Sequence, residues 1–288
     1  MTIAHELIGR FANLTRHYHL QRFDPLIRII HNPDKQKKRS IKKIILINNE
    51  TLFSIDTSSY LEWTLFFYGE YEPFTQKLIT SMVKPGSVAL DIGANIGIHT
   101  ITLAKATGPT GKVYSFEPHP TIFNKLITNI SLNNLQWVHP IKTALTDTSG
   151  TAILCGFDHQ TSNEGTSALG NKASEQPLQK NQFHVTTITL DDFVALHNIT
   201  KLDIIKIDVE GHEINVFNGA IKTLTTLKPI IIFEDSAKNV IVENSPIRKL
   251  FNDLSYTLYA IHYNHLSELT HNHKGYNFLA VPPFNTNK

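Results

Sequence analysis

The chain has 288 residues, of which 41% are hydrophobic and 18% are charged. This composition is ordinary for a folded globular protein and excludes collagen-like, low-complexity and wholly disordered chains. The formal net charge of +2 argues against a long nucleic-acid footprint. A single cysteine, Cys155, excludes an intramolecular disulfide and a four-cysteine zinc site.

The N-terminal segment lacks the features of a secretion signal. Charged and histidine side chains, such as Glu6, Arg10 and His17, interrupt any apolar run there. No stretch of the sequence reaches the roughly 18 apolar residues that a membrane-spanning helix needs. We therefore expect a cytoplasmic protein without a membrane span.

Residues 1–83 are predicted to form an N-terminal extension of helices and a hairpin. An amphipathic helix is expected first, followed by a basic stretch at 35–39 that is more typical of a solvated loop than of an anion-binding site. Strand-like runs at 41–47 and 51–55 flank two asparagines, which indicates a hairpin turn. Residues 60–83 are aromatic-rich and helical in pattern. We expect the extension to act as a lid or a dimerisation element.

From residue 84 to residue 288, strands and helices alternate. Strands are expected at Val88–Leu90, Lys112–Phe116, Trp137–Ile141, Leu202–Asp208, Pro229–Phe233, Tyr256–His262 and Asn277–Val281. Helices are expected at Ile98–Ala106, Pro120–Asn133, Glu213–Leu224 and Pro246–Leu254. This alternation predicts βαβ units in a doubly wound α/β domain with a mostly parallel sheet. The last two strands, which no clear helix separates, should add an antiparallel edge.

A polar segment interrupts this alternation between residues 156 and 182. Strands are predicted on either side of it, at Thr151–Leu154 and Val185–Leu190. Because long connections inside a compact domain are usually functional, we interpret the segment as a surface loop or an insertion on the substrate side.

A glycine-containing turn follows the strand expected at 88–90 and reads Asp91-Ile-Gly93-Ala-Asn95-Ile-Gly97. Ligands of open α/β sheets bind beyond the carboxyl ends of the strands, where this turn lies. Gly93 permits a tight turn, and Gly97 permits close approach of a ligand or strand. The spacing is not GxGxxG, which weakens a nicotinamide-binding interpretation.

Two acidic residues follow the next two strands. Glu117 stands after Asp91 at about the spacing at which an acidic side chain binds a ribose diol. Asp147, after the third strand, could accept a hydrogen bond from an adenine amine, although an aspartate that forms the turn before Ser149-Gly150 is nearly as plausible.

The strand expected at 202–208 ends in a cluster of ionisable groups, Lys206-Ile-Asp208-Val-Glu210-Gly-His212-Glu213. At a strand end these groups should have shifted pKa values. Glu213 could simply favour the positive end of the following helix, and a lone histidine at a helix start is more often structural. Magnesium coordination is a weaker alternative, for which oxygen ligands would come from Asp208, Glu210, Glu234 and Asp235.

In this order, the three motifs Asp-Ile-Gly-Ala-Asn-Ile-Gly, Phe-Glu-Pro and Lys-Ile-Asp-Val-Glu-Gly-His-Glu resemble those of the FkbM family of S-adenosylmethionine-dependent methyltransferases. The resemblance covers roughly residues 68–236 and includes Glu72 within Gly69-Glu-Tyr-Glu-Pro73. It implies a class I methyltransferase (Rossmann-like) fold with a seven-stranded sheet. It also implies O-methylation of a hydroxyl on a small molecule or sugar, with S-adenosylmethionine as the cofactor.

The resemblance also implies roles for single residues. Glu72 and Asp91 would supply negative charge near the cationic cofactor, Glu117 would bind its ribose, and Asp147 its adenine. Backbone N–H groups between Gly93 and Gly97, around Asn95, could meet its carboxylate at a helix N-terminus. An acceptor hydroxyl gains from a base that removes its proton. The candidates for that base are Asp208, Glu210 and His212.

Two other interpretations remain open. A nicotinamide-dependent oxidoreductase could use the same kind of sheet, and a non-catalytic nucleotide-binding module could retain it. A nucleic-acid methyltransferase is disfavoured, because the strand ending at Asp208 is not followed by an Asn/Asp-Pro-Pro-aromatic motif. A homodimer is also possible.

Overall fold

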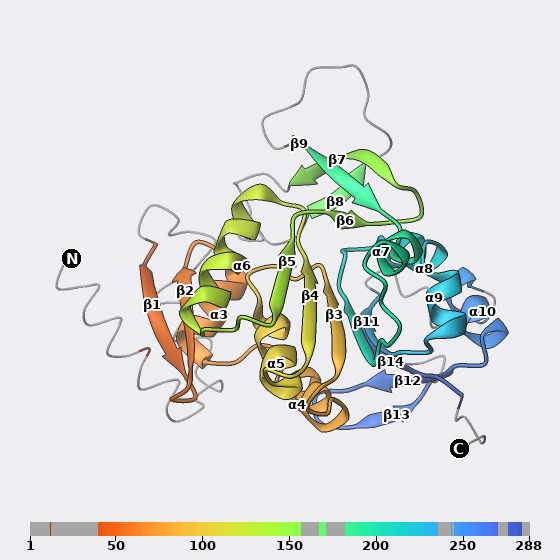
Figure 1. Cartoon of the computed structure of the whole chain (residues 1–288). Coiled ribbons are helices and arrows are strands. Elements are labelled where there is room, and N and C mark those ends of the chain that lie inside the picture. The colour runs from red at the N-terminus through yellow and green to blue at the C-terminus, as the bar shows by residue number, and fades with distance from the viewer. Residues whose placement is uncertain are drawn as a thin grey trace.

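The structure is a computed structural model that describes Ala12 and residues 40–156, 167–170, 182–235, 243, 245–269 and 276–283 (Figure 1). The helix predicted at the N-terminus and the basic stretch at 35–39 lie outside these ranges, apart from Ala12. None of the helices within the described ranges is long and apolar enough to cross a bilayer.

The described ranges contain an eight-stranded sheet with the order β13-β12-β14-β11-β10-β3-β4-β5. These strands are β13 (Leu266–Glu268), β12 (Thr257–Ile261), β14 (Asn277–Val281), β11 (Ile230–Glu234), β10 (Ile204–Ile207), β3 (Val88–Ile92), β4 (Lys112–Phe116) and β5 (Val138–Ile141). The chain runs outward from β3 to β5 and then returns to β10 beside β3, so the sheet is doubly wound and changes direction between β3 and β10. This is the predicted class I methyltransferase fold.

One detail of the predicted sheet needs correction. The seven expected strands are all present, but β13 adds an eighth at the edge beside β12. The antiparallel edge predicted for the last two strands is confirmed, and its order is reversed along the chain: β14 is inserted between β11 and β12 and is antiparallel to both. Local patterning gave no sign of this, because insertion depends on which neighbours a strand finds and not on its own alternation.

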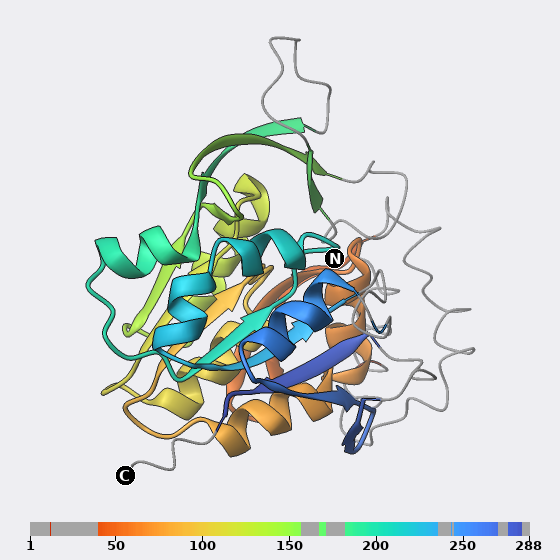
Figure 2. The same cartoon turned by 90° about the vertical axis from the view of Figure 1, so that its right-hand side faces the viewer.

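Helices cover both faces of this sheet (Figure 2). The helices α5 (Ile98–Thr107) and α6 (Pro120–Leu132) share a hydrophobic cluster with one face. The other face packs against α7 (Leu190–Leu196), α8 (Glu213–Asn218), α9 (Ile221–Thr226) and α10 (Pro246–Asp253). The sheet alternates accordingly: on β10, Ile204 belongs to the first cluster, and Ile205 and Ile207 belong to the second.

The helix predicted at 213–224 is divided into α8 and α9. The break lies at Gly219, where a Cβ atom would stand 2.1 Å from the carbonyl oxygen of Thr146. The chain there approaches the backbone that follows β6 too closely for a side chain, which the helical pattern did not reveal. The helix α7 was not predicted.

Residues 40–83 pack directly on the eight-stranded sheet and its helices. The predicted hairpin is confirmed as β1 (Lys42–Ile47) and β2 (Thr51–Asp56). Side-chain amides on α6 and at its C-terminus bind the free edge of β2: Asn129 accepts from the N–H of Ser54, and Asn133, which follows the helix, bonds both backbone groups of Leu52. The helical region is two helices, α3 (Tyr60–Tyr68) and α4 (Pro73–Met82), separated by a left-handed Gly69. Its role as a lid or dimer contact stays a prediction.

A second sheet of four strands lies beyond the carboxyl ends of β4 and β5, at the top of Figure 1. Its order is β6 (Ala144–Leu145), β9 (Gln182–Ile188), β7 (Gly150–Gly156) and β8 (Ser167–Gly170). The two flanking strands are therefore confirmed. The interval between them is not all loop, because β8 forms a strand there and pairs with β7. The remainder of that interval lies outside the described residues.

Candidate functional site

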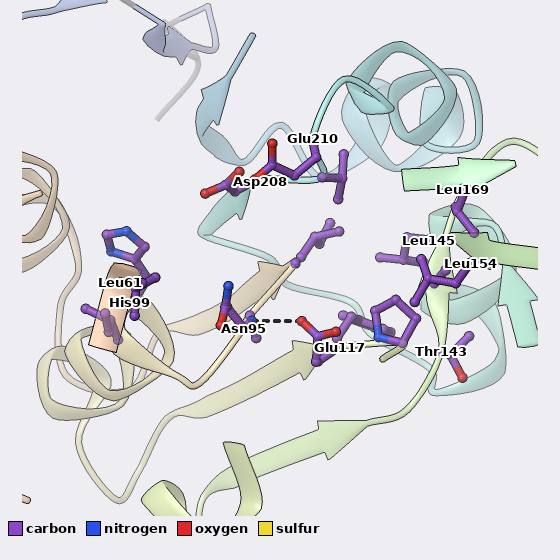
Figure 3. A pocket seen from close by; sticks show the side chains of 18 of the residues that line it. Leu61, Asn95, His99, Glu117, Thr143, Leu145, Leu154, Leu169, Asp208 and Glu210 are labelled. Carbon is purple, nitrogen blue, oxygen red and sulfur yellow. Dashed lines mark hydrogen bonds between the residues drawn. The ribbon is translucent and has the colours of Figure 1, made fainter. Parts of the chain in front are cut away.

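A cavity of about 300 Å³ opens at the point where the sheet changes direction. Its walls include the segments that follow four parallel strands, at 92–95, 116–118, 143–145 and 208–210. Open α/β sheets bind their ligands at this position because the chain diverges there and leaves a crevice. Figure 3 shows the cavity from close by.

The two ends of the cavity differ in chemistry (Figure 3). Leu145, Leu154 and Leu169 form an aliphatic end, and they come from three strands of the second sheet. Asp208 and Glu210 lie together, away from the leucines and above Asn95 in the view of Figure 3, and Leu61 and His99 lie farther to the left. The cavity can therefore take a ligand with one apolar part and one cationic part.

Glu117 is buried beside the middle of the cavity and is held by two backbone groups. Its Oε2 accepts from the N–H of Asn95 at 2.9 Å, and its Oε1 accepts from the N–H of His119 at 2.8 Å. Burial raises the pKa of Glu117 to about 7, and the negative charges of Asp91 and Asp208 add to the rise, although the two hydrogen bonds lower the pKa. A carboxylate has about four acceptor sites, so the group can still bind two hydroxyls of a ligand.

The turn that carries Asn95 is left-handed at three positions. Gly93, Asn95 and Gly97 have φ angles of 80°, 50° and 98°. A Cβ atom on Gly97 would lie 2.8 Å from Cδ1 of Leu126, so the glycine lets α5 and α6 pack closely. Gly93 and Asn95 line the cavity, whereas Gly97 does not.

Asp91 and Glu72 lie behind the cavity wall, not on it. Asp91 is 2% exposed and accepts a 2.5 Å hydrogen bond from the Thr100 hydroxyl, and burial raises its pKa. Glu72 accepts from Nε2 of His99 at 3.1 Å and from the Asn277 amide at 3.0 Å. Burial opposes ionisation of Glu72, but these contacts and the charge of Lys206 hold its pKa at about 2. Neither carboxylate is positioned to touch a ligand in the cavity. Each can act on a ligand through the electrostatic field of its charge or through His99, which lines the cavity.

Asp208 and Glu210 both line the cavity at the end of β10. The Asp208 carboxylate lies 3.7 Å from Nζ of the buried Lys206. Partial burial and the negative charges of Asp208 and Glu213 raise the pKa of Glu210 to about 7. The backbone of Glu210 is also left-handed, with φ 54°. This conformation is strained for any residue other than glycine.

Asp147 and His212 do not line the cavity. Asp147 is exposed and accepts a 2.7 Å hydrogen bond from the Asn215 amide, a contact that lowers its pKa. His212 bonds the Thr146 hydroxyl at 2.8 Å through Nε2. These two contacts connect the start of α8 to the segment that follows β6, and the predicted roles of both residues stay predictions.

Sequence reasoning missed the aliphatic end and His99. Leu154 and Leu169 reach the cavity through the pairing of β7 with β8, and the register of that pair cannot be read from alternation alone. His99 could have been found, because it is the second residue of a helix that begins directly after the glycine turn.

The described residues contain no cluster of three or more His, Cys, Asp or Glu side chains arranged to hold a metal ion. Of the four acidic residues that the sequence offers for magnesium, Asp208 and Glu210 line the cavity. In the part of the chain that the structure describes, no third acidic, histidine or cysteine side chain joins them to form a metal site.

Comparison with known proteins gives related chains. Residues 91–273 match the Methyltransferase FkbM domain. The hexuronic acid methyltransferase AglP of Haloferax volcanii is 28% identical over 163 residues, which cover 54% of this chain and 59% of AglP. Methyltransferase 1 of Beauveria bassiana is 26% identical over 145 residues, which cover 46% of this chain and 58% of that protein. The matches thus span about three-fifths of the length of these curated relatives.

Among solved structures, methyltransferase FkbM from Methylobacillus flagellatus aligns with a TM-score of 0.45 at 12% identity, over 89% of this chain and 60% of that one. The O-methyltransferase from Bacillus cereus, solved in complex with SAH, aligns with a TM-score of 0.44 at 18% identity, over 74% and 83% of the two chains. Alignments this distant establish no residue correspondence. The FkbM domain match covers more than half of the sequence, and this protein therefore belongs to the FkbM methyltransferase family.

Proposed function

We propose that the chain is an S-adenosylmethionine-dependent methyltransferase that methylates a hydroxyl group of a small molecule or carbohydrate. The observation that carries the proposal is the two-ended cavity at the sheet's change of direction, with the Glu117 carboxylate beside its middle. The membership in the FkbM family supports the same reaction class.

The adenosine part of the cofactor fits the aliphatic end. Leu145, Leu154 and Leu169 offer an apolar surface to a flat purine, and Glu117 can accept from the two ribose hydroxyls. Asp147, which the sequence predicts to bind adenine, does not line the cavity and accepts from the Asn215 amide, so this proposal assigns the adenine surface to the three leucines.

The cationic part of the cofactor fits the acidic end. S-adenosylmethionine supplies an electrophilic methyl group on a positively charged sulfur. Asp208 and Glu210 line this end, and the fixed negative charge of Glu72 lies behind His99. In a cavity with little water, such charges attract a cation more strongly than exposed ones do.

The acidic end also offers a base for the acceptor. A carboxylate whose pKa is about 7 takes up a proton efficiently near neutral pH, and Glu210 has that pKa. We assign Glu210 as the proton acceptor and Asp208 as the neighbouring group that orients the hydroxyl.

The relatives support a class of acceptor. AglP is named a hexuronic acid methyltransferase, which supports a carbohydrate as the acceptor. A homodimer, a lid role for residues 1–83 and a cytoplasmic location remain predictions.

A transfer assay tests this function. The purified chain is incubated with methyl-labelled S-adenosylmethionine and a panel of neutral sugars, hexuronic acids and phenols, with Asp208→Asn as the control. The proposal expects an acceptor-dependent product whose label survives mild base, because a methyl ether resists hydrolysis. Label in a base-labile methyl ester, or in no product at all, would contradict it.

A further inference from the structure

Lys206 is a fully buried cation in the centre of the main sheet. The side chain is 0% exposed and stands on β10, between two fully or nearly fully buried isoleucines. In the parallel pairing of β10 with β3, Lys206 is the partner of Asp91. Partners in a parallel pair point to the same face, so the ammonium group reaches the side that α5 covers.

Four carboxylates from four parts of the chain act electrostatically on this ammonium group. They are Asp208 directly after the same strand, Asp91 on β3, Glu234 at the end of β11 and Glu72 before α4, and all four raise the pKa of Lys206 against the effect of burial. Nζ lies 3.7 Å from the Asp208 carboxylate and 3.3 Å from the carbonyl oxygen of Ile207. A buried charge is stable only when opposite charges compensate it, so the ammonium and the carboxylates hold each other in place.

The geometry points to Lys206 as the positioning residue of the acidic end: its ammonium group holds Glu72, Asp91 and Asp208 together behind and beside the cavity. Lys206 itself does not line the cavity and touches no ligand there. This inference rests on the proposed function for its meaning in catalysis, but the arrangement of charges can be tested without turnover.

Loss of the ammonium group should change the protonation of its neighbours. Lys206 lowers the pKa of Glu72, Asp91, Glu210 and Glu234, so removal of its charge should raise all four. Glu72 also faces His99 and Asn277, and Glu210 also faces Asp208 and Glu213. These groups are unchanged in a Lys206 variant, so a shift measures the lysine alone.

The direct test is carbon-13 NMR titration of glutamate side-chain carboxyls in Lys206→Met. Glu72→Gln and Glu210→Gln identify the two resonances, and Lys201→Met, which removes a 60% exposed lysine, is the matched control. We expect Glu72 in Lys206→Met to titrate about 1 pH unit or more higher than in the unchanged chain, and Lys201→Met to leave it unmoved. Unchanged titration of Glu72 in Lys206→Met would overturn the inference.

A ligand test adds a second readout. S-adenosylhomocysteine carries an amino-acid part, whereas methylthioadenosine lacks it, and both contain the adenosine that Glu117 should bind. As the pH is lowered, the affinity for S-adenosylhomocysteine should begin to fall at a higher pH in Lys206→Met than in the unchanged chain, because the carboxylates become protonated earlier. The pH dependence of the affinity for methylthioadenosine should not change. The same shift for both ligands would count against the inference. Failure of the unchanged chain to bind either ligand would instead contradict the proposed function, and the NMR titration would still decide the role of Lys206.

If Lys206→Met does not fold, Lys206→Met with Glu234→Gln removes one positive and one negative charge together. Burial and Asp208 raise the pKa of Glu234 to about 8, so its replacement by a neutral amide should be tolerated. An unmoved Glu72 titration in this folded double variant would equally overturn the inference.

Discussion

A Cβ atom on Gly93 would lie 1.8 Å from the carbonyl oxygen of Asp208. The turn after β3 and the end of β10 therefore meet backbone to backbone, at the point where the sheet changes direction. This contact sets the floor of the cavity and places Asp208 next to the turn that binds Glu117. A side chain at Gly93 would force the two strand ends apart.

Gly93→Ala should accordingly destabilise the fold and abolish cofactor binding. The substitution combines a left-handed conformation with a backbone overlap, which together cost about 2–5 kcal/mol. Gly86→Ala is the control: Gly86 has nearly the same φ, 82°, but the nearest atom to its Cβ position, Oγ1 of Thr110, lies at an ordinary contact distance of 3.7 Å. Urea unfolding followed by circular dichroism should show a much larger loss for Gly93→Ala, and equal losses would contradict the contact.

Glu117 should make the stability of the ligand-free protein fall as pH rises. Its pKa is about 7 in the folded chain, above the unfolded value of 4.5, so the folded state binds more protons between these values. Ionising this buried carboxyl group lowers the free energy of unfolding. The loss is absent below about pH 4.5, complete above about pH 7, and on the order of 3 kcal/mol. In Glu117→Gln, the unfolding free energy should lose this part of its pH dependence. Parallel pH curves for the two proteins would show that the pKa of Glu117 is not raised.

Asp208 and His212 should respond differently to substitution. Asp208→Asn should slow methyl transfer by about 10²-fold and should also weaken cofactor binding, because the carboxylate orients the acceptor hydroxyl and lines the acidic end of the cavity. His212→Gln should lower the melting temperature and leave the pH profile of turnover unmoved, because His212 bonds Thr146 outside the cavity. Turnover, affinity and melting temperature are measured on both variants. A large rate loss in a stable His212→Gln would reinstate the histidine as the base.

Glu210 should be under backbone strain that glycine relieves. Glu210→Gly should melt at a higher temperature than Glu210→Gln, by an amount that corresponds to about 1 kcal/mol, since only glycine adopts φ 54° without cost. Both variants lose the carboxylate, so their difference reports the backbone alone. Neither should methylate acceptors at the normal rate. Identical melting temperatures would mean that the left-handed conformation is not strained.

The aliphatic end should govern the affinity for adenosine. Leu154→Ala with Leu169→Ala removes apolar surface from one side of the expected purine and should weaken methylthioadenosine binding by about tenfold or more. Asp147→Asn should leave the affinity as it was, because Asp147 bonds Asn215 instead. Calorimetry measures the affinity of both variants for methylthioadenosine. If Asp147→Asn loses more affinity than the double leucine variant, the aspartate and not the leucines binds adenine.

Much of the main sheet was predictable because its strands carry their own signal. The strands at Lys112–Phe116 and Asn277–Val281 have the expected bounds, and the hairpin at 42–56 was indicated by its asparagine turn. Glu117 and Gly93 were predictable from their place after two such strands, since the carboxyl ends of parallel strands meet at one edge.

The rest of the site depends on contacts between distant segments. The partner of Asp147 is Asn215, the partner of Glu72 is Asn277, and the position of β14 inside the sheet follows from its pairing with β11 and β12. No local pattern carries such pairings. Leu154 and Leu169 of the second sheet were missed for the same reason.

The central claim is that the cavity binds S-adenosylmethionine and not a nicotinamide dinucleotide. The most direct measurement is isothermal titration calorimetry of the unchanged chain with S-adenosylhomocysteine and, separately, with NADH. We predict saturable one-to-one binding of S-adenosylhomocysteine and no binding of NADH, because the turn at Gly93 lacks the GxGxxG spacing that a pyrophosphate needs. Saturable binding of NADH, with no heat from S-adenosylhomocysteine at millimolar concentration, would contradict the account.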